Sequence, residues 1–145
     1  LISVVFLTYC SVIPPQFKPS FQSTESLIGS WRGTDVDGET ANLIFFADGS
    51  IIFVFEDIRI GDSNVGSPYE VTYKVNSNTI PWELDIYAKE NGIDMGVLRG
   101  LIEMIDDRTI RIGFDTTSEK GFGEPRPVDF SSLNAASIVI LKKIN

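Results

Sequence analysis

The sequence predicts an all-β fold, an eight-stranded antiparallel up-and-down barrel preceded by an apolar N-terminal segment. From residue 27 onward, short apolar or alternating runs are separated by Gly, Pro, Asn and Asp, which favour turns. No segment shows a convincing helical period. Eight such runs follow one another, and closing them into a barrel removes the edges that an open sheet exposes. An eight-stranded sandwich is the main alternative.

The first three strands are expected at residues 27–35, 40–47 and 50–56. Asp48-Gly49 joins the second and third strands, because glycine accepts the positive φ that tight hairpin turns require. Residues 57–67 are rich in Gly, Asp, Ser and Asn, so a loop is expected there.

The second half of the barrel starts at the clearest alternation in the chain. Tyr69, Val71, Tyr73 and Val75 fall on one face, which is the period of two of a half-buried strand. A long loop is expected at 116–134. The five strands of this half are expected at 69–75, 82–88, 95–105, 108–115 and 136–143.

The run at 95–105 also admits a helical interpretation. Gly96 and Gly100 lower its helix propensity and instead favour a sharply curved strand. We therefore expect a strand there.

Composition narrows the function classes. The chain has 145 residues, which fits one domain, and a formal charge of −8, which disfavours binding to nucleic acid or directly to anionic lipid. Histidine is absent and Cys10 is the only cysteine. An intrachain disulfide, a His-based zinc or haem site and a His-dependent catalytic triad are therefore excluded, and no cofactor or metal is expected.

The N-terminal segment is expected to be an export signal. Residues 1–13 are apolar, end at Pro14-Pro15 and are too short to span a bilayer comfortably. Residues 7–10 resemble a lipoprotein signal box that would acylate Cys10, although Tyr9 occupies a position where a small residue is expected. The alternatives are an ordinary signal remnant or a strand packed on the domain.

This interpretation divides the chain at residue 26. We expect residues 1–26 to be a signal remnant and a Pro/Ser-rich tether, and 27–145 to be the barrel domain. The protein would then be secreted or periplasmic, with membrane contact only through a lipid anchor at Cys10.

A family resemblance begins at Gly29-Ser30-Trp31, which is similar to the G-x-W motif of lipocalins. The resemblance implies that Trp31 plugs the closed end of the barrel and that a cation from the last strand, Lys142 or Lys143, stacks against it. Of these two residues, Lys142 is the one assigned to this contact. The wider pattern resembles a lipocalin-like domain family of bacterial secreted proteins, notably a planctomycete repeat, over about residues 27–143. Its further motifs are Asp48-Gly49, residues 81–86, Gly96, residues 107–112 and residues 126–130.

The chain departs from that family at two places. Residues 95–98 replace a Gly-Ile-Tyr-like start of the sixth strand, and Ile112 lies near the position of the family's usual cysteine. The family has no firmly assigned activity, so the resemblance implies a fold and leaves the function open.

The first candidate site is the barrel interior, where apolar side chains would line a pocket for a small apolar molecule. The alternative is that the same side chains fill the barrel as plain core. The candidates are Phe45, Phe53, Phe55, Tyr69, Tyr73, Leu84, Ile86 and Phe114.

The second candidate pairs Arg126 with Asp129, where the planar guanidinium would hold an anion. The alternative is a structural ion pair, for example with Asp85, that fixes the long loop. The acidic run 35–39 lacks the full spacing of a calcium loop and is expected to be a plain hairpin.

Catalysis is not expected. Acid–base chemistry would need paired carboxylates in a cleft, and the available ones lie near turns, where carboxylates are usually solvated. These carboxylates are Asp85, Asp106, Asp107 and Asp115.

Two functions remain open. One is an extracytoplasmic carrier of a small apolar or amphipathic ligand. The other is a non-enzymatic structural or accessory subunit of an envelope or extracellular assembly, with a filled barrel and a protein partner.

Overall fold

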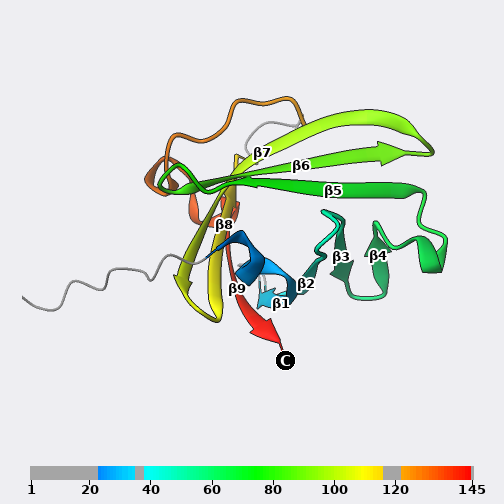
Figure 1. Cartoon of the computed structure of the whole chain (residues 1–145), viewed down its shortest axis with the longest axis horizontal. Helices are drawn as coiled ribbons and strands as arrows, with labels where there is room; N and C mark the ends of the chain where they lie inside the picture. The colour runs from blue at the N-terminus through cyan, green and yellow to red at the C-terminus, as the bar shows by residue number, and fades with distance from the viewer. Residues whose placement is uncertain (1–22, 35–37, 116–121, 145) are drawn as a thin grey trace, which may run out of the picture.

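Nine antiparallel strands form one continuous sheet that curls into a nearly closed barrel in the computed structural model of this chain (Figure 1). The structure describes residues 23–34, 38–115 and 122–144. The expected signal segment, including Cys10, lies outside the described residues. The predicted barrel is confirmed, with one strand more than the sequence suggested.

Within the described residues, nine strands and four short 3-10 helices follow one another along the chain. The helices are η1 (Thr24–Leu27), η2 (Ser63–Val65), η3 (Phe130–Ser132) and η4 (Ala135–Ser137). The strands are β1 (Gly29–Thr34), β2 (Thr40–Phe45), β3 (Ile51–Phe55), β4 (Ile58–Ile60), β5 (Tyr69–Asn76), β6 (Trp82–Glu90), β7 (Ile93–Asp106), β8 (Thr109–Phe114) and β9 (Ile138–Ile144).

The first strand, β1, pairs with the last strand, β9, whereas β4 and β5 are the two edge strands of the sheet and do not pair with each other. The sheet order is β4-β3-β2-β1-β9-β8-β7-β6-β5, so β9 pairs with β1 and every other neighbour is consecutive in sequence. Across the remaining seam, Ser50 bridges to Thr72, and the Tyr73 amide donates to the Gly49 carbonyl at 2.8 Å. Figure 1 shows the long strands β5–β7 crossing one side of the barrel and β1–β4 lying opposite.

The expected loop at 57–67 is wrong in part, because it contains β4 and η2. Ile58 pairs with Phe55 of β3, and Ile60 pairs with Phe53. Because β4 has only three residues and lies among turn residues, its period of two could not be recognised in the sequence. Gly61 ends β4 at a positive φ of 89°, where an added Cβ would lie 2.7 Å from the Ile51 carbonyl oxygen.

The expected ends of the first and last strands also need correction. Residues 24–26, assigned to the tether, form η1 together with Leu27, which is fully buried. Residues 136–137 belong to η4 and not to the last strand. Here short 3-10 turns complete the barrel ends, and their local hydrogen bonds leave no periodic signal in the sequence.

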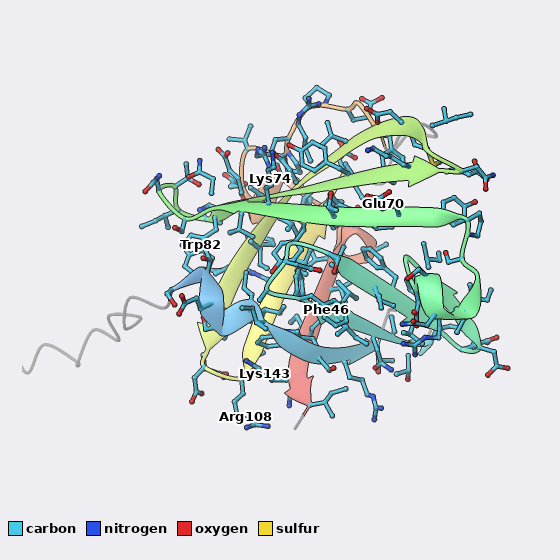
Figure 2. The ribbon with its side chains drawn as sticks, turned by 45° about the vertical axis from the view of Figure 1, so that its right-hand side comes forward. Phe46, Glu70, Lys74, Trp82, Arg108 and Lys143 are labelled. Atoms are coloured by element: carbon cyan, nitrogen blue, oxygen red, sulfur yellow. The ribbon has the colours of Figure 1, made fainter. Side chains whose placement is uncertain are left out.

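The expected alternation along β5 is present. Val71 is buried, and Tyr69, Tyr73 and Val75 pack against the core cluster. Glu70 and Lys74 are exposed and are labelled along β5 in Figure 2. The interior of the barrel is therefore built from one face of each strand.

The run at 95–105 is a strand, so the helical interpretation is wrong. The pairing of β6 with β7 shifts between Ala88 and Lys89, which leaves Met95 as an extra residue beside Gly96. Gly96 has a φ of 104°, a conformation that glycine adopts without strain. This bulge bends β7 and turns Met95 toward the pocket described below.

Candidate binding pocket

A pocket of about 290 Å³ lies at one end of the barrel, where β3 and β6 finish and β5 and β7 begin; we call this the pocket end. Its walls come from both sides of the seam between β4 and β5, and from β6, β7 and the segment after residue 121. It is partly open to solvent. The lining residues are Phe53, Phe55, Ile60, Tyr69, Val71, Ile86, Ala88, Met95, Leu98 and Phe122.

The described lining is almost wholly apolar, and among these residues only Tyr69 contributes a hydroxyl group. The Phe53 and Phe55 rings lie parallel, with centroids 6.3 Å apart and an angle of 5° between their planes. A dry apolar cavity of about 150 Å³ accommodates benzene, so this pocket suits a ligand about twice that size. It offers hydrophobic contact and ring stacking, with little polar recognition.

Small side chains and incomplete strand pairing leave this space open. Val71 and Ala88 face each other across β5 and β6, so two short side chains meet where a closed core would need larger ones. Because β4 does not pair with β5 in the sheet, none of the described strands fills the gap beside Val71. The pocket therefore follows from the local sequence.

The eight interior residues predicted from the sequence separate into two groups. Phe53, Phe55, Tyr69 and Ile86 line the pocket. The other four pack in the core cluster outside the pocket lining: Phe45, Tyr73, Leu84 and Phe114. The first four therefore support the pocket interpretation, and the last four act as core; Ile86 belongs to the same core cluster and forms part of the pocket wall as well.

Tyr73 illustrates the residues that act as core. Its ring meets the ring of Phe45 edge-on, with centroids 4.9 Å apart, and its hydroxyl donates to the Phe46 carbonyl oxygen at 2.9 Å. Burial, and then the negative charge of Asp48, raise the pKa of the Tyr73 hydroxyl above its usual value. The Tyr73 hydroxyl therefore stays protonated and donates this hydrogen bond to the Phe46 carbonyl oxygen.

Six lining residues were missed at the sequence level. Val71, Ala88 and Leu98 lie on the inward faces of β5, β6 and β7, so strict use of the alternation would have found the first two. The others depend on an unrecognised strand, a bulge and a loop, which give no periodic signal: Ile60, Met95 and Phe122.

Trp31 lies at the opposite end, which we call the Trp31 end, and is fully buried. Its indole Nε1 donates to the Leu27 carbonyl oxygen at 2.7 Å. Lys143 places its Nζ 5.3 Å from the indole centroid and donates to the Ser26 carbonyl oxygen at 2.9 Å (labelled in Figure 2). The contact is a cation–π interaction that also closes η1 over the indole.

The assignment of this cation to Lys142 is wrong. Lys143 stands directly opposite Trp31 in the pairing of β1 with β9, whereas Lys142 stands opposite Arg32 and is exposed. Opposite residues in an antiparallel pair share one face, so only Lys143 can reach the indole.

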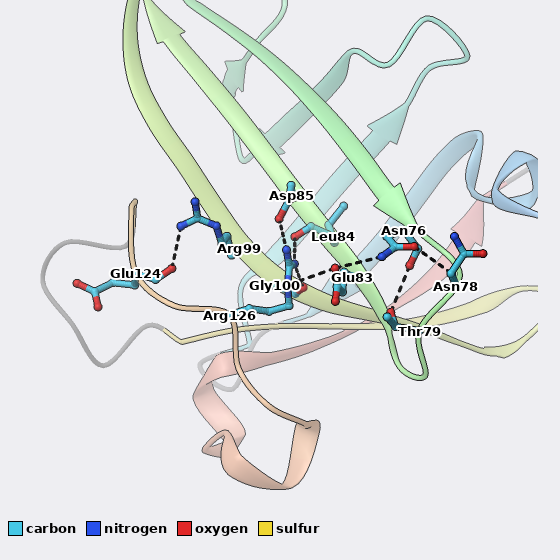
Figure 3. A network of polar contacts seen from close by, with 10 residues as sticks. All are labelled: Asn76, Asn78, Thr79, Glu83, Leu84, Asp85, Arg99, Gly100, Glu124 and Arg126. Carbon is cyan, nitrogen blue, oxygen red and sulfur yellow. Dashed lines mark hydrogen bonds and ion pairs between the residues drawn. The ribbon is translucent and has the colours of Figure 1, made fainter.

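Arg126 and Asp129 do not form the expected pair. The Arg126 guanidinium contacts Asp85 at 2.7 Å and Glu83 at 3.7 Å, and donates to the Gly100 carbonyl oxygen at 2.8 Å (Figure 3). Because its planar fork is occupied by the protein itself, the anion-binding interpretation is not supported. The alternative, a contact with Asp85 that holds the long loop on the barrel, is present.

Asp129 instead caps η3. Its carboxylate accepts hydrogen bonds from the Ser131 hydroxyl at 2.6 Å and the Ser132 amide at 2.9 Å. These two bonds, the hydroxyl first, lower the pKa of Asp129 below its usual range. Only two residues separate it from Arg126 in sequence, but the two side chains make different contacts.

Replacing Arg126 with alanine is expected to destabilise the domain by about 1–3 kcal/mol, because Asp85 and the Gly100 carbonyl lose a charged donor. Arg99 is the control, since its guanidinium makes one weak contact, to the Glu124 carbonyl oxygen at 3.4 Å. Urea unfolding measures both variants. Equal losses for Arg126→Ala and Arg99→Ala would contradict the structural role of Arg126.

The remaining carboxylates give no catalytic arrangement in the described residues. Asp85 is held by Arg126, and Asp106 accepts the Arg108 amide at 2.8 Å, which is the main reason for the lowered pKa of Asp106. No candidate carboxylate lines the pocket. Within residues 23–34, 38–115 and 122–144, no group of three or more metal-ligating side chains occurs. Part of the acidic run 35–39 lies outside the described residues.

Comparison with known proteins finds no matching protein-family model, curated protein or solved structure. In the part of the chain that the structure describes, no helix is long and apolar enough to cross a membrane. The pocket is therefore the feature of the molecule that indicates a function.

Proposed function

We propose that this protein is a non-enzymatic binding protein that carries a small apolar ligand in the pocket, and that it acts outside the cytoplasm as a lipocalin-like domain. The observation that carries the proposal is the apolar pocket of about 290 Å³ that opens beside the core cluster of the barrel. The expected location is supported by the apolar run at residues 1–13.

An empty apolar pocket is unfavourable, and this supports a resident ligand. Side chains along a void lose packing partners, and apolar surface left against water forfeits the free energy of burial. Phe55 and Met95 are 43% and 39% exposed although both line the pocket. A ligand that covers them would recover that burial.

The alternative function, an accessory subunit with a filled barrel, has less support. Its interior would need to be packed throughout, whereas the pocket opens beside the core cluster and shares Val71 and Ile86 with it. Several exposed apolar side chains lie in separate loops and strand ends, including Ile80 and Val128. They do not identify a partner surface.

Replacing Ala88 with phenylalanine is expected to weaken binding of a neutral fluorescent probe, phenyl-naphthylamine, by about tenfold or more. Ala88 is 6% exposed and lines the pocket, so a larger side chain occupies the ligand's space. Probe fluorescence on titration measures the dissociation constant, and circular dichroism checks the fold.

Two further variants make this test specific. Ala47→Phe adds the same group at an exposed turn and should bind the probe like the unchanged protein. Ala88→Leu adds less bulk and should reduce affinity while disturbing the fold less. Probe binding that is unaffected in both folded Ala88 variants would refute the pocket as the binding site.

A further inference from the structure

The charges around the pocket end indicate which ligands the pocket accepts. Tyr69, a lining residue, stands directly opposite Glu90 in the pairing of β5 with β6. Opposite residues share one face of the sheet, with Cβ atoms about 5 Å apart. Glu90 therefore belongs to the inward face of β6, one step beyond Ala88, and it is half-buried.

The neighbouring positions confirm this placement. Leu84, Ile86 and Ala88 alternate inward along β6, and Glu90 continues that period of two. Lys89 lies between the last two, pairs with Glu70 and Asp94, and is exposed on the other face. The inward face of β6 thus ends in a carboxylate at the pocket mouth.

The described cations do not neutralise this carboxylate. Arg59 is held by Asp62, at 2.6 Å between Nε and Oδ2, and Lys89 belongs to the outer face. In the part of the chain that the structure describes, Glu90 takes part in no ion pair. Glu56 and Asp57 follow the lining residue Phe55 and add further negative charge at this end.

We propose that the pocket selects an uncharged or cationic apolar ligand and rejects carboxylates and other anions, and that Glu90 sets this preference. This rests on the proposed function and adds the ligand class to it. Among the residues that the structure describes, the lining contains no cation that could hold an anion: it is apolar except for the Tyr69 hydroxyl group. An anionic head group at the mouth would instead meet Glu90 in a partly dehydrated setting, where repulsion is stronger than in water.

Two probes with one skeleton test this selectivity on the full chain. Phenyl-naphthylamine is neutral, and anilinonaphthalene sulfonate adds a single sulfonate to the same rings. The neutral probe is expected to bind about tenfold or more tightly at low salt. Raising the salt concentration should narrow the gap, since screening weakens charge repulsion but leaves a steric mismatch unchanged.

Glu90→Gln and Glu70→Gln form a matched pair of variants. Both remove one carboxylate from adjacent strands, but Glu70 is exposed on the outer face (Figure 2). Glu90→Gln should raise the affinity for the sulfonate about three- to tenfold and leave that for the neutral probe unchanged. Glu70→Gln should change neither by more than about twofold, since its charge is screened.

The outcomes separate this inference from the proposed function. Equal affinity for both probes, or equal effects of Glu90→Gln and Glu70→Gln, would overturn the role of Glu90 while leaving the carrier intact. Failure of the neutral probe to bind, or binding that ignores both folded Ala88 variants, would overturn the carrier as well.

Discussion

Replacing Trp31 with alanine is expected to destabilise the barrel by about 3–5 kcal/mol, the range measured for deleting large buried aromatic side chains. Trp31 is fully buried, and its removal leaves a void among Leu27, Ile110 and the other core residues. A domain of this size has a total stability of about 5–15 kcal/mol, so the variant should be close to unfolding at physiological temperature.

Two contacts beyond packing are lost with the indole. The Leu27 carbonyl oxygen loses its donor at 2.7 Å, and Lys143 loses the ring beneath its ammonium group. Trp31→Phe separates these effects, because it keeps an aromatic ring while removing the N–H. Its expected cost is about 1–3 kcal/mol, dominated by the unsatisfied carbonyl and the smaller ring.

Urea unfolding followed by far-ultraviolet circular dichroism gives the free energy of unfolding of each variant. Trp82→Ala is the control, since it deletes the same side chain from a half-buried position on β6. If Trp31→Ala lowers the free energy of unfolding no more than Trp82→Ala does, Trp31 does not stabilise the Trp31 end of the barrel.

The fold was predictable from the sequence because most strands have a strong period of two and clear turns. Gly49, in the Asp48-Gly49 turn, and both residues of the Asn91-Gly92 turn have the positive φ that hairpin turns favour. β4 was missed because a three-residue strand has too few positions to display a period. Its existence depends on pairing with β3, a tertiary contact that single-sequence propensity does not report.

The pocket was only partly predictable, for a different reason. Alternation shows which side chains of one strand share a face, and the register of β2 and β3 then puts Phe45 and Phe53 on the same side of the sheet. It does not show whether the space between them is filled. That depends on how far β4 and β5 separate and on where Phe122 packs, and neither is encoded in the period of one strand.

The Lys142 error shows the limit of counting without a register. A shift of one residue in a strand moves a side chain to the opposite face of the sheet. Lys142 and Lys143 are adjacent and chemically identical, so only the pairing of β9 with β1 distinguishes the residue above Trp31. Arg126 shows the same limit in a loop, because its partner Asp85 lies far away in sequence.

The second large effect is expected at Gly100, where substitution by alanine should destabilise the domain by about 2–3 kcal/mol through overpacking. A Cβ at this position would lie 2.4 Å from two ring atoms of Phe114 and 2.7 Å from the Gly113 carbonyl oxygen. The ring can move only at the expense of core packing, and the carbonyl belongs to the backbone of β8, so one of the two strands must shift.

A double-mutant cycle with Phe114→Leu tests this explanation. The smaller leucine removes the ring atoms that crowd Gly100, so the double variant should lose less stability than the sum of the two single variants, by about 1 kcal/mol. Part of the cost should persist, because the Gly113 carbonyl stays in place. Urea unfolding of the four proteins measures the coupling. Strictly additive losses would mean that Phe114 does not confine Gly100, and that the close approach of β7 and β8 has another cause.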